Sequence, residues 1–489
     1  MKLSICMVAA EVAPFAKTGG LADVAGALTK YLDGAGHDVR LFMPFYSRID
    51  VKLLEIQRVD FLQNLPLEFN AHRYQYSVWS ARLPNSDARC YLIECPALYA
   101  RASIYSTDAD EHLRFLALTR ATLECCQRMG WSPQIFHCND WHTAFAPLLL
   151  KSAYAWDQLF RSTRSVLTIH NIGYQGVFAA SLAADVGLGE GSALLHQADL
   201  NAGRVNSLKH GIMYADGITT VSPTYAREIL TEQLGMGLQY SLRARAAALV
   251  GILNGVDYDD WDPRWDRHLP KHFGPYELAV KAELKKEFMQ RLGMKASGSA
   301  ALFGIVSRLT VQKGFDLLFD TLPTLLAQRD ACLVVLGSGE ERYENFFALL
   351  QRQFPNRVVF HRGYSEPLAH WIEAASDLFI MPSLYEPCGL NQMYSLRYGT
   401  VPIVRNTGGL ADSVRLYDPV KGEGDGIVFD NFNAEAMTWA LNAGLDLYAQ
   451  PEHWQRMLRN GMAQDFSWEK QGARYVELYQ KLIAVGAVP

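Results

Sequence analysis

The chain has 489 residues, of which 49% are hydrophobic and 20% are charged, as expected of a globular protein with two or three domains. Its 46 basic and 51 acidic side chains give a net charge of −5, and it has no basic run, so nucleic-acid binding is not expected. The 37 glycines and 20 prolines are an ordinary share, which excludes a collagen-like or low-complexity chain.

Short apolar runs alternate with longer amphipathic stretches along the chain. In chain order, the runs predict strands at 3–8, 39–43, 134–136, 165–169, 218–221, 301–306, 332–336, 358–360, 378–381 and 402–404. Helices are predicted between many of them, including 21–32, 113–129, 315–327 and 367–375. This alternation indicates an α/β protein with parallel sheets. Because one open sheet of so many strands would be unusually wide, two sheets are expected.

A cluster of turn-forming and acidic residues at 254–263 marks the predicted boundary between two domains. The amphipathic stretch 468–485 predicts a final helix that could pack on either domain. Eight cysteines lie in apolar segments without a C-x-x-C pair, which favours reduced thiols in a cytoplasmic protein. The longest uncharged stretch, 165–184, contains several polar residues, so no membrane span or membrane partner is expected.

One six-residue sequence occurs twice. Thr18-Gly-Gly-Leu-Ala-Asp23 recurs as Thr407-Gly-Gly-Leu-Ala-Asp412, once in each half of the chain. Each copy follows a predicted strand and opens a helix pattern, where glycine N–H groups can approach an anion at a helix N-terminus. Two turns that serve only tight packing are the alternative. One copy in each half favours two domains that face one cleft.

Polar side chains follow many of the predicted strands, at the edge where open α/β sheets bind ligands. Arg308 and Lys313 form a pair of cations that could hold a diphosphate, unless they are a solvated surface pair. Glu386 could contact a sugar or support a developing oxocarbenium ion, or it could cap a helix. Both roles of Glu386 could hold together.

Other polar residues leave two interpretations open. His170 and Asn171 could bond substrate hydroxyls or belong to the core, and Asp140 could bind sugar beside Trp141 or lie next to a packing residue. The spacing of the histidines at 137 and 142 is a weak metal signal, so no metal is predicted. Cys388 has no obvious base partner and is expected to be a packing thiol.

Together these motifs resemble those of the bacterial glycogen synthases and plant starch synthases. The matching stretches, in family order, are 11–23, 139–142, 168–171, 254–257, 307–314, 382–390 and 407–410. The K-T-G-G-L and E-P-C-G-L elements are specific to this family, whereas Val256 stands where isoleucine is common. The resemblance covers almost the whole chain.

The resemblance implies a GT-B fold, in which two Rossmann-like, doubly wound parallel-sheet domains face a cleft. Residues 1–253 would form an acceptor-side domain of the starch synthase catalytic type. Residues 254–465 would form a nucleotide-sugar-binding domain of the glycosyltransferase group 1 type, and residues 466–489 a helix that crosses back to the first domain. The implied reaction is glucose transfer from ADP-glucose to the non-reducing 4-hydroxyl of an α-1,4-glucan, with retention and without a cofactor. The sequence does not indicate an oligomeric state.

The resemblance also assigns roles by motif. Around the donor diphosphate and base it places the following residues: Lys17, Gly19, Gly20, Asp23, Tyr364, Cys388, Gly389, Leu390, Thr407, Gly408, Gly409 and Leu410. Asp140, His170 and Asn171 would line the glucosyl and acceptor side. Arg308 and Lys313 would grip the phosphates, and Glu386 would lie by the transferred sugar.

Three rival functions remain open. A glucosyltransferase of the sucrose or trehalose type would use UDP-glucose instead. A nicotinamide-dependent oxidoreductase needs a G-x-G-x-x-G motif, which neither 11–26 nor 337–339 provides. A non-catalytic glucan-binding protein would not need two cations and a glutamate in a cleft.

Overall fold

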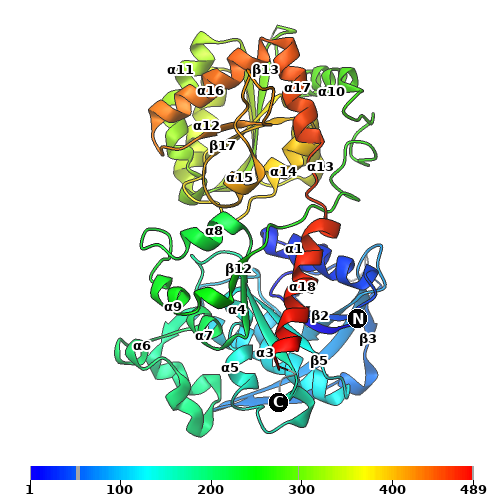
Figure 1. Ribbon diagram of the computed structural model, residues 1–489, viewed down its shortest axis with the longest axis vertical. Helices are drawn as coiled ribbons and strands as arrows, with labels where there is room; N and C mark the ends of the chain where they lie inside the picture. Colours follow the sequence, from blue (N-terminus) through cyan, green and yellow to red (C-terminus); the bar gives the residue numbers. More distant parts are fainter. Residues whose placement is uncertain (1, 51–54, 296, 487–489) are drawn as a thin grey trace. The chain divides into compact units, whose positions relative to one another are not determined.

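The computed structural model describes residues 2–50, 55–295 and 297–486 (Figure 1). The chain divides into two compact units, one of Met1–Gly255 with Trp468–Pro489 and one of Val256–Ser467. Each unit is built around a sheet of mainly parallel strands that carries helices on its faces. Among the described residues, no helix is long and apolar enough to cross a membrane.

The first unit has a ten-stranded sheet. Its parallel strands run in the order β12 (Leu249–Gly251), β11 (Gly217–Thr220), β8 (Arg164–Ile169), β7 (Ile135–Asn139), β1 (Ser4–Val8), β2 (Asp38–Pro44) and β6 (Arg89–Glu94). The antiparallel β5 (His72–Arg82) follows β6 and pairs with β3 (Gln57–Arg58) and β4 (Leu65–Phe69). The strands are added outward from β1 in one direction and from β7 in the other, so the strand order reverses between these two parallel neighbours. Open parallel sheets bind ligands at such a point.

Ten α-helices accompany this sheet in the described part of the unit. They are α1 (Gly20–Gly34), α2 (Pro96–Tyr99), α3 (Glu111–Arg128), α4 (Asp140–Thr143), α5 (Ala146–Leu150), α6 (Gln197–Asn201), α7 (Ser207–Tyr214), α8 (Pro223–Glu228), α9 (Gln239–Ala244) and α18 (Trp468–Gly486). Helix α18 lies beside α1 (Figure 1). A Cβ at Gly472 would come within 2.2 Å of the Tyr31 ring, so glycine allows this close approach.

The second unit has a six-stranded parallel sheet. Its order is β15 (Val358–Arg362), β14 (Ala331–Gly339), β13 (Ala301–Leu309), β16 (Leu378–Met381), β17 (Val401–Arg405) and β18 (Ile427–Phe429). This is the doubly wound Rossmann order, which reverses between β13 and β16. The helices are α10 (Leu278–Arg291), α11 (Leu318–Gln328), α12 (Glu341–Gln353), α13 (Glu366–Ala375), α14 (Asn391–Arg397), α15 (Gly408–Ser413), α16 (Ala434–Tyr448) and α17 (Pro451–Met462).

All ten predicted strands occur in the structure, because strands buried on both faces read as continuous apolar runs. The predicted terminal helix is α18. The predicted helix 315–327 is instead a 3₁₀ turn, Phe315–Leu317, followed by α11. Strands β3 to β6, β12 and β18 were not predicted, nor were β9 (Val177–Ala179) and β10 (Arg204–Asn206), which form a separate two-stranded sheet. Exposed and half-buried residues interrupt the apolar sequence of β5, and β12 and β18 are only three residues long.

Candidate active site

The loop between β1 and α1 carries the first copy of the repeated sequence. The buried Glu11 carboxylate accepts hydrogen bonds from the N–H of Thr18 and from its hydroxyl, the latter at 2.8 Å. Lys17 and Asp23 form an ion pair of 2.7 Å at the protein surface. Gly20, the first residue of α1, is exposed. The loop is therefore fastened at Thr18 while its glycine backbone faces solvent.

Asp140 lies directly after β7. Strand β7 neighbours β1 at the point where the strand order reverses. The backbone of Asp140 has φ of +54°, which is uncommon for a residue with a side chain. Its Oδ1 accepts hydrogen bonds from the N–H groups of His170 (2.7 Å) and Asn171 (3.3 Å), the two residues that follow β8. Burial raises the pKa of Asp140 to about 7, because no cation compensates its desolvation and the two backbone bonds do so only in part. Asp140 can thus change protonation near neutral pH.

His170 is a neutral hydrogen-bonding group. Its Nε2 donates to Asn139 Oδ1 at 2.8 Å, and burial lowers the pKa of His170 to about 3. The Asn139 side chain in turn donates to the carbonyl of Val8 at 3.0 Å, which ties the end of β7 to the end of β1. The structure therefore joins Asp140, His170 and Asn171 in one hydrogen-bonded group.

The histidines at 137 and 142 contact hydroxyl groups and aromatic rings of the protein interior. The Tyr479 hydroxyl of α18 lies 2.6 Å from His137 Nδ1, and the Thr168 hydroxyl lies 2.6 Å from its Nε2. His142 stacks against Tyr105 with ring centroids 4.9 Å apart. Tyr105 is also hydrogen-bonded to Glu11, so it belongs to the surroundings of the first loop. The sequence analysis missed Tyr105, because it lies in an irregular segment without a motif.

In the second unit, the loops after β13 and β16 meet at the reversal point of the sheet. Lys313 Nζ lies 2.6 Å from Glu386 Oε2, and the Ser383 hydroxyl donates to the same oxygen at 3.0 Å. The Lys313 and Glu386 side chains are only 19% and 6% exposed, so water screens this pair weakly. A Cβ at Gly314 would lie 2.0 Å from the Pro382 carbonyl oxygen, so glycine lets the two loops touch.

Arg308 lies near the end of β13 and has an exposed side chain. Across the described parts of the chain, 2–50, 55–295 and 297–486, no carboxylate forms an ion pair with it. The two predicted cations therefore differ, since Lys313 contacts Glu386 and Arg308 points its charge to solvent. Tyr364, in the loop after β15, is 62% exposed.

The second copy of the repeated sequence packs on the E-P-C-G-L segment. The N–H of Gly409 donates to the main-chain carbonyl of Glu386 at 3.0 Å. A Cβ at Gly409 would lie 2.2 Å from the Cys388 carbonyl oxygen. The Gln392 side chain donates to the carbonyls of Cys388 (3.1 Å) and Gly389 (3.0 Å). Thr407, Gly408 and Leu410 are buried beside this contact.

The predicted residues thus form two groups, one in each unit, at the carboxyl ends of the parallel strands. The first group is Lys17, Gly19, Gly20, Asp23, Asp140, His170 and Asn171, and the second is Arg308, Lys313, Tyr364, Glu386, Cys388, Gly389, Leu390, Thr407, Gly408, Gly409 and Leu410. Each group adjoins the point where the strand order reverses, except for Tyr364, which follows the edge strand β15. Such a point is the common ligand site of open α/β sheets.

Comparison with known proteins finds one family model that matches in each unit. Residues 4–244 match the family model of the starch synthase catalytic domain, and residues 294–461 match that of the glycosyl transferases group 1. A glycogen synthase of Anaeromyxobacter dehalogenans (strain 2CP-C) is 43% identical over 98% of this chain and 100% of its own length. The glycogen synthase of Thermotoga maritima is 40% identical, over 99% of each chain.

A solved structure extends the match to three dimensions. The catalytic domain of starch synthase IV from Arabidopsis thaliana, bound to ADP and acarbose, superposes with a TM-score of 0.90 at 34% identity. The match covers 99% of this chain and 100% of that one. The fold is therefore GT-B, as expected from the motifs. With relatives of this identity along its full length, the chain belongs to the glycogen and starch synthase family of glycosyltransferases.

Proposed function

We propose that this glycosyltransferase transfers glucose from ADP-glucose to the non-reducing 4-hydroxyl of an α-1,4-glucan, with retention of configuration. The observation that carries the proposal is the Lys313–Glu386 pair at the reversal point of the second sheet. It offers a cation for a leaving phosphate and a carboxylate for a sugar that becomes positively charged. The ADP and acarbose bound to the related starch synthase support the same choice of donor and acceptor classes.

On the donor side, charge grows on the diphosphate as the glucosyl bond breaks. Lys313 and Arg308 would stabilise that charge, and a weakly screened cation such as Lys313 does so strongly. The loop of Thr407, Gly408, Gly409 and Leu410 would lie along the diphosphate. Because the amide of Gly409 holds the main chain of Glu386, this loop also positions the carboxylate. Tyr364 would stack on the base, and Cys388, Gly389 and Leu390 would shape the pocket floor.

On the sugar and acceptor side, Asp140, His170 and Asn171 would line the transferred glucose. In the first unit, Lys17, Gly19 and Gly20 would contact the donor, with Asp23 holding Lys17. We propose a front-face, ion-pair-like route in which Glu386 gives electrostatic support. Exclusion of water from the site would favour transfer, because water competes with the glucan as acceptor.

The decisive experiment is incubation with glycogen and either ADP-glucose or UDP-glucose. We expect ADP release to match glucan chain extension, with a clear preference for ADP-glucose. Preference for UDP-glucose would overturn the donor assignment. Glucan binding without turnover of either donor would identify a non-catalytic binding protein. The eight cysteines are all free thiols, which supports a reducing, cytoplasmic location for this reaction.

A further inference from the structure

A cluster of metal-ligating side chains in the second unit has no part in the proposed transfer. Asp260 belongs to the segment 256–277, which precedes α10, while Glu366 and His370 lie four residues apart on α13. This spacing puts Glu366 and His370 on one face of the helix. One carboxylate oxygen of Asp260, one of Glu366 and one imidazole nitrogen of His370 all lie within 4.8 Å of one another.

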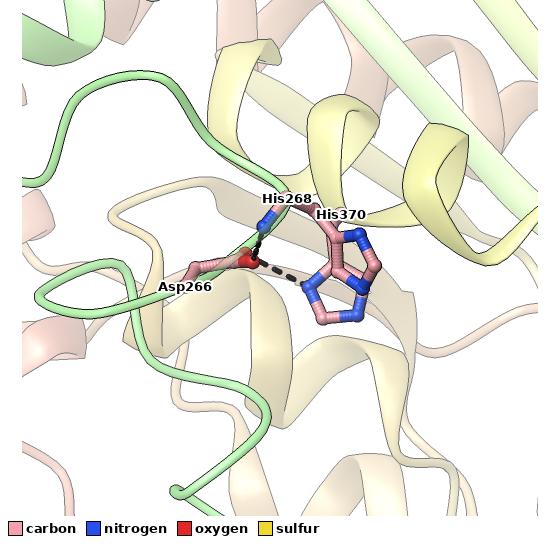
Figure 2. Close-up of side chains that lie close together, drawn as sticks. All are labelled: Asp266, His268 and His370. Carbon is pink, nitrogen blue, oxygen red and sulfur yellow. Dashed lines mark hydrogen bonds and ion pairs between the residues drawn. The ribbon is translucent and has the colours of Figure 1, made fainter.

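The imidazole of His370 is held in one orientation. Its Nδ1 lies 2.8 Å from Asp266 Oδ2, which also accepts a hydrogen bond from the Tyr398 hydroxyl at 2.6 Å. Asp266 Oδ1 accepts from the N–H of His268 at 2.8 Å, as Figure 2 shows. The ring of Trp261 stacks on His370 with centroids 3.7 Å apart. Since Asp266 is a carboxylate that accepts every one of these bonds, Nδ1 is the nitrogen that donates to it, and Nε2 is left for another partner.

The second ring nitrogen of His370, Nε2, is buried without a partner among the described residues. The His370 side chain is fully buried. A buried polar atom without a partner costs free energy unless something binds it. A histidine that donates from one ring nitrogen to a carboxylate and presents the other is the usual arrangement of a metal ligand.

A second set, Asp266, His268 and His370, also lies within 4.8 Å (Figure 2). Both oxygens of Asp266 are already occupied by protein donors, so an ion there would have to break those bonds. Within the described residues, no hydrogen bond occupies the carboxylate of Asp260 or of Glu366. Asp266 is therefore the residue that orients His370, and the two other carboxylates are the ligands.

The carboxylates of Asp260 and Glu366 lie near the cation Arg267, which forms only long ion pairs with them. Arg267 Nη2 lies 3.6 Å from Asp260 Oδ1 and 3.8 Å from Glu366 Oε1, both beyond hydrogen-bond distance. The Arg267 side chain is 72% exposed and can swing into solvent. Asp260 and Glu366 are 37% and 47% exposed, so they can turn inward to metal–ligand bonds of about 2.0–2.2 Å.

We propose that Asp260, Glu366 and His370 bind one divalent ion of the zinc class, which fastens the segment 256–277 to α13. One imidazole and two carboxylates suit such an ion, with water completing the coordination. The site is structural and shares no residue with those proposed for glucose transfer.

The test uses the full chain, freed of metal by a chelator and titrated with ZnCl₂ by calorimetry. We expect one equivalent to bind and the thermal transition to rise. Glu366→Gln and Asp260→Asn should each weaken binding about 10-fold or more. Glu341→Gln, which removes an exposed acid from the first turn of α12, is the matched control and should bind like the wild type.

Two further measurements separate this site from adsorption to surface histidines. Arg267→Ala should tighten zinc binding several-fold, because it removes the competing cation. Co²⁺ bound in place of zinc should give a visible spectrum that changes in Glu366→Gln, a variant that leaves the buried His370 in place. Wild-type affinity in both carboxylate variants, or no binding below millimolar zinc, would overturn the proposal.

Discussion

The same six residues, T-G-G-L-A-D, lie in very different surroundings in the two units. In the first unit, Thr18 and Gly20 are exposed, and a Cβ at Gly19 would meet nothing closer than a Glu11 oxygen at 4.0 Å. In the second unit, Thr407 is buried and Gly409 is pressed against the backbone of Cys388. The first loop is open around Gly19, whereas Gly409 of the second loop lies against the protein backbone.

The partner glutamates differ in the same way. Glu11 holds the first loop with its side chain, which accepts both bonds from Thr18. Glu386 holds the second loop with its main-chain carbonyl, so its side chain can pair with Lys313. The turns differ in backbone geometry as well, since Gly19 has φ of −159° and its counterpart Gly408 has φ of +46°. The surroundings of an identical motif therefore decide its backbone shape and how closely its glycines pack.

The largest expected effect tests the packing side of this comparison. In Gly409→Ala the new methyl would lie 2.2 Å from a backbone oxygen, so we expect a loss of about 3 kcal/mol in the free energy of unfolding of the second unit. Gly19→Ala should cost less than about 1 kcal/mol, because its φ of −159° suits any residue. Hydrogen exchange resolved by peptide measures both, and equal losses would contradict the comparison.

The next largest effect concerns the two cations of the second unit that are proposed to bind the donor phosphates. Lys313→Ala and Arg308→Ala should each lower kcat by about 10²-fold or more, since leaving-group stabilisation is lost. Steady-state kinetics with ADP-glucose and glycogen measures this. Lys421→Ala, which removes an exposed lysine of the same unit, is the control. Near-wild-type rates in both variants would remove the phosphate assignment.

The third prediction concerns Asp140, the buried carboxylate of the first unit. Unlike Glu386, which pairs with Lys313, Asp140 has no lysine beside it among the described residues. The pKa of Asp140 is raised from 3.8 to about 7, so the folded state holds this proton more tightly than the unfolded state. Stability from this group is therefore full below about pH 4 and falls as pH rises toward 7. Asp140→Asn keeps the backbone bonds and tolerates positive φ.

We expect Asp140→Asn to be at least as stable as wild type at pH 8, by thermal unfolding, and to lose about 10-fold or more in kcat. At pH 4 the two proteins should have similar stability, because both carry a neutral side chain there. A variant that is less stable at pH 8 and unchanged in rate would show that Asp140 serves only the fold.

The smallest effect tests the exposed loop. The Lys17–Asp23 pair lies at the surface, so Lys17→Ala should change the free energy of unfolding by less than about 1 kcal/mol. If Lys17 contacts the donor, KM for ADP-glucose should rise about 10-fold. Wild-type KM and kcat together would show that the first loop has been misassigned.

Local sequence pattern predicted the parts of the molecule that local forces determine. Strands such as β1 and β16 are continuous apolar runs, and their predicted positions agree with the structure. β5 was missed because it is antiparallel and half exposed, so polar residues interrupt its pattern. The polar residues of the candidate site were singled out because they follow strands, where parallel sheets bind ligands, and their role there stays a prediction.

Contacts between distant segments could not be predicted from spacing. Nothing in the sequence near Gly409 indicates that the Cys388 carbonyl lies against it, and Gly314 meets Pro382 only because two loops converge. The cluster of Asp260, Glu366 and His370 was missed for the same reason, since only the fold brings the segment 256–277 to α13. One partner of the Glu11 loop, Tyr105, carries no recognisable pattern at all.

Helix α18 has a consequence for how the polypeptide matures. It belongs to the first unit although it follows the whole of the second, and its Tyr479 contacts His137 inside the first sheet. During translation the second unit can therefore complete its core before the first, which must wait for α18 to leave the ribosome. The half that is made first is the half that finishes folding last.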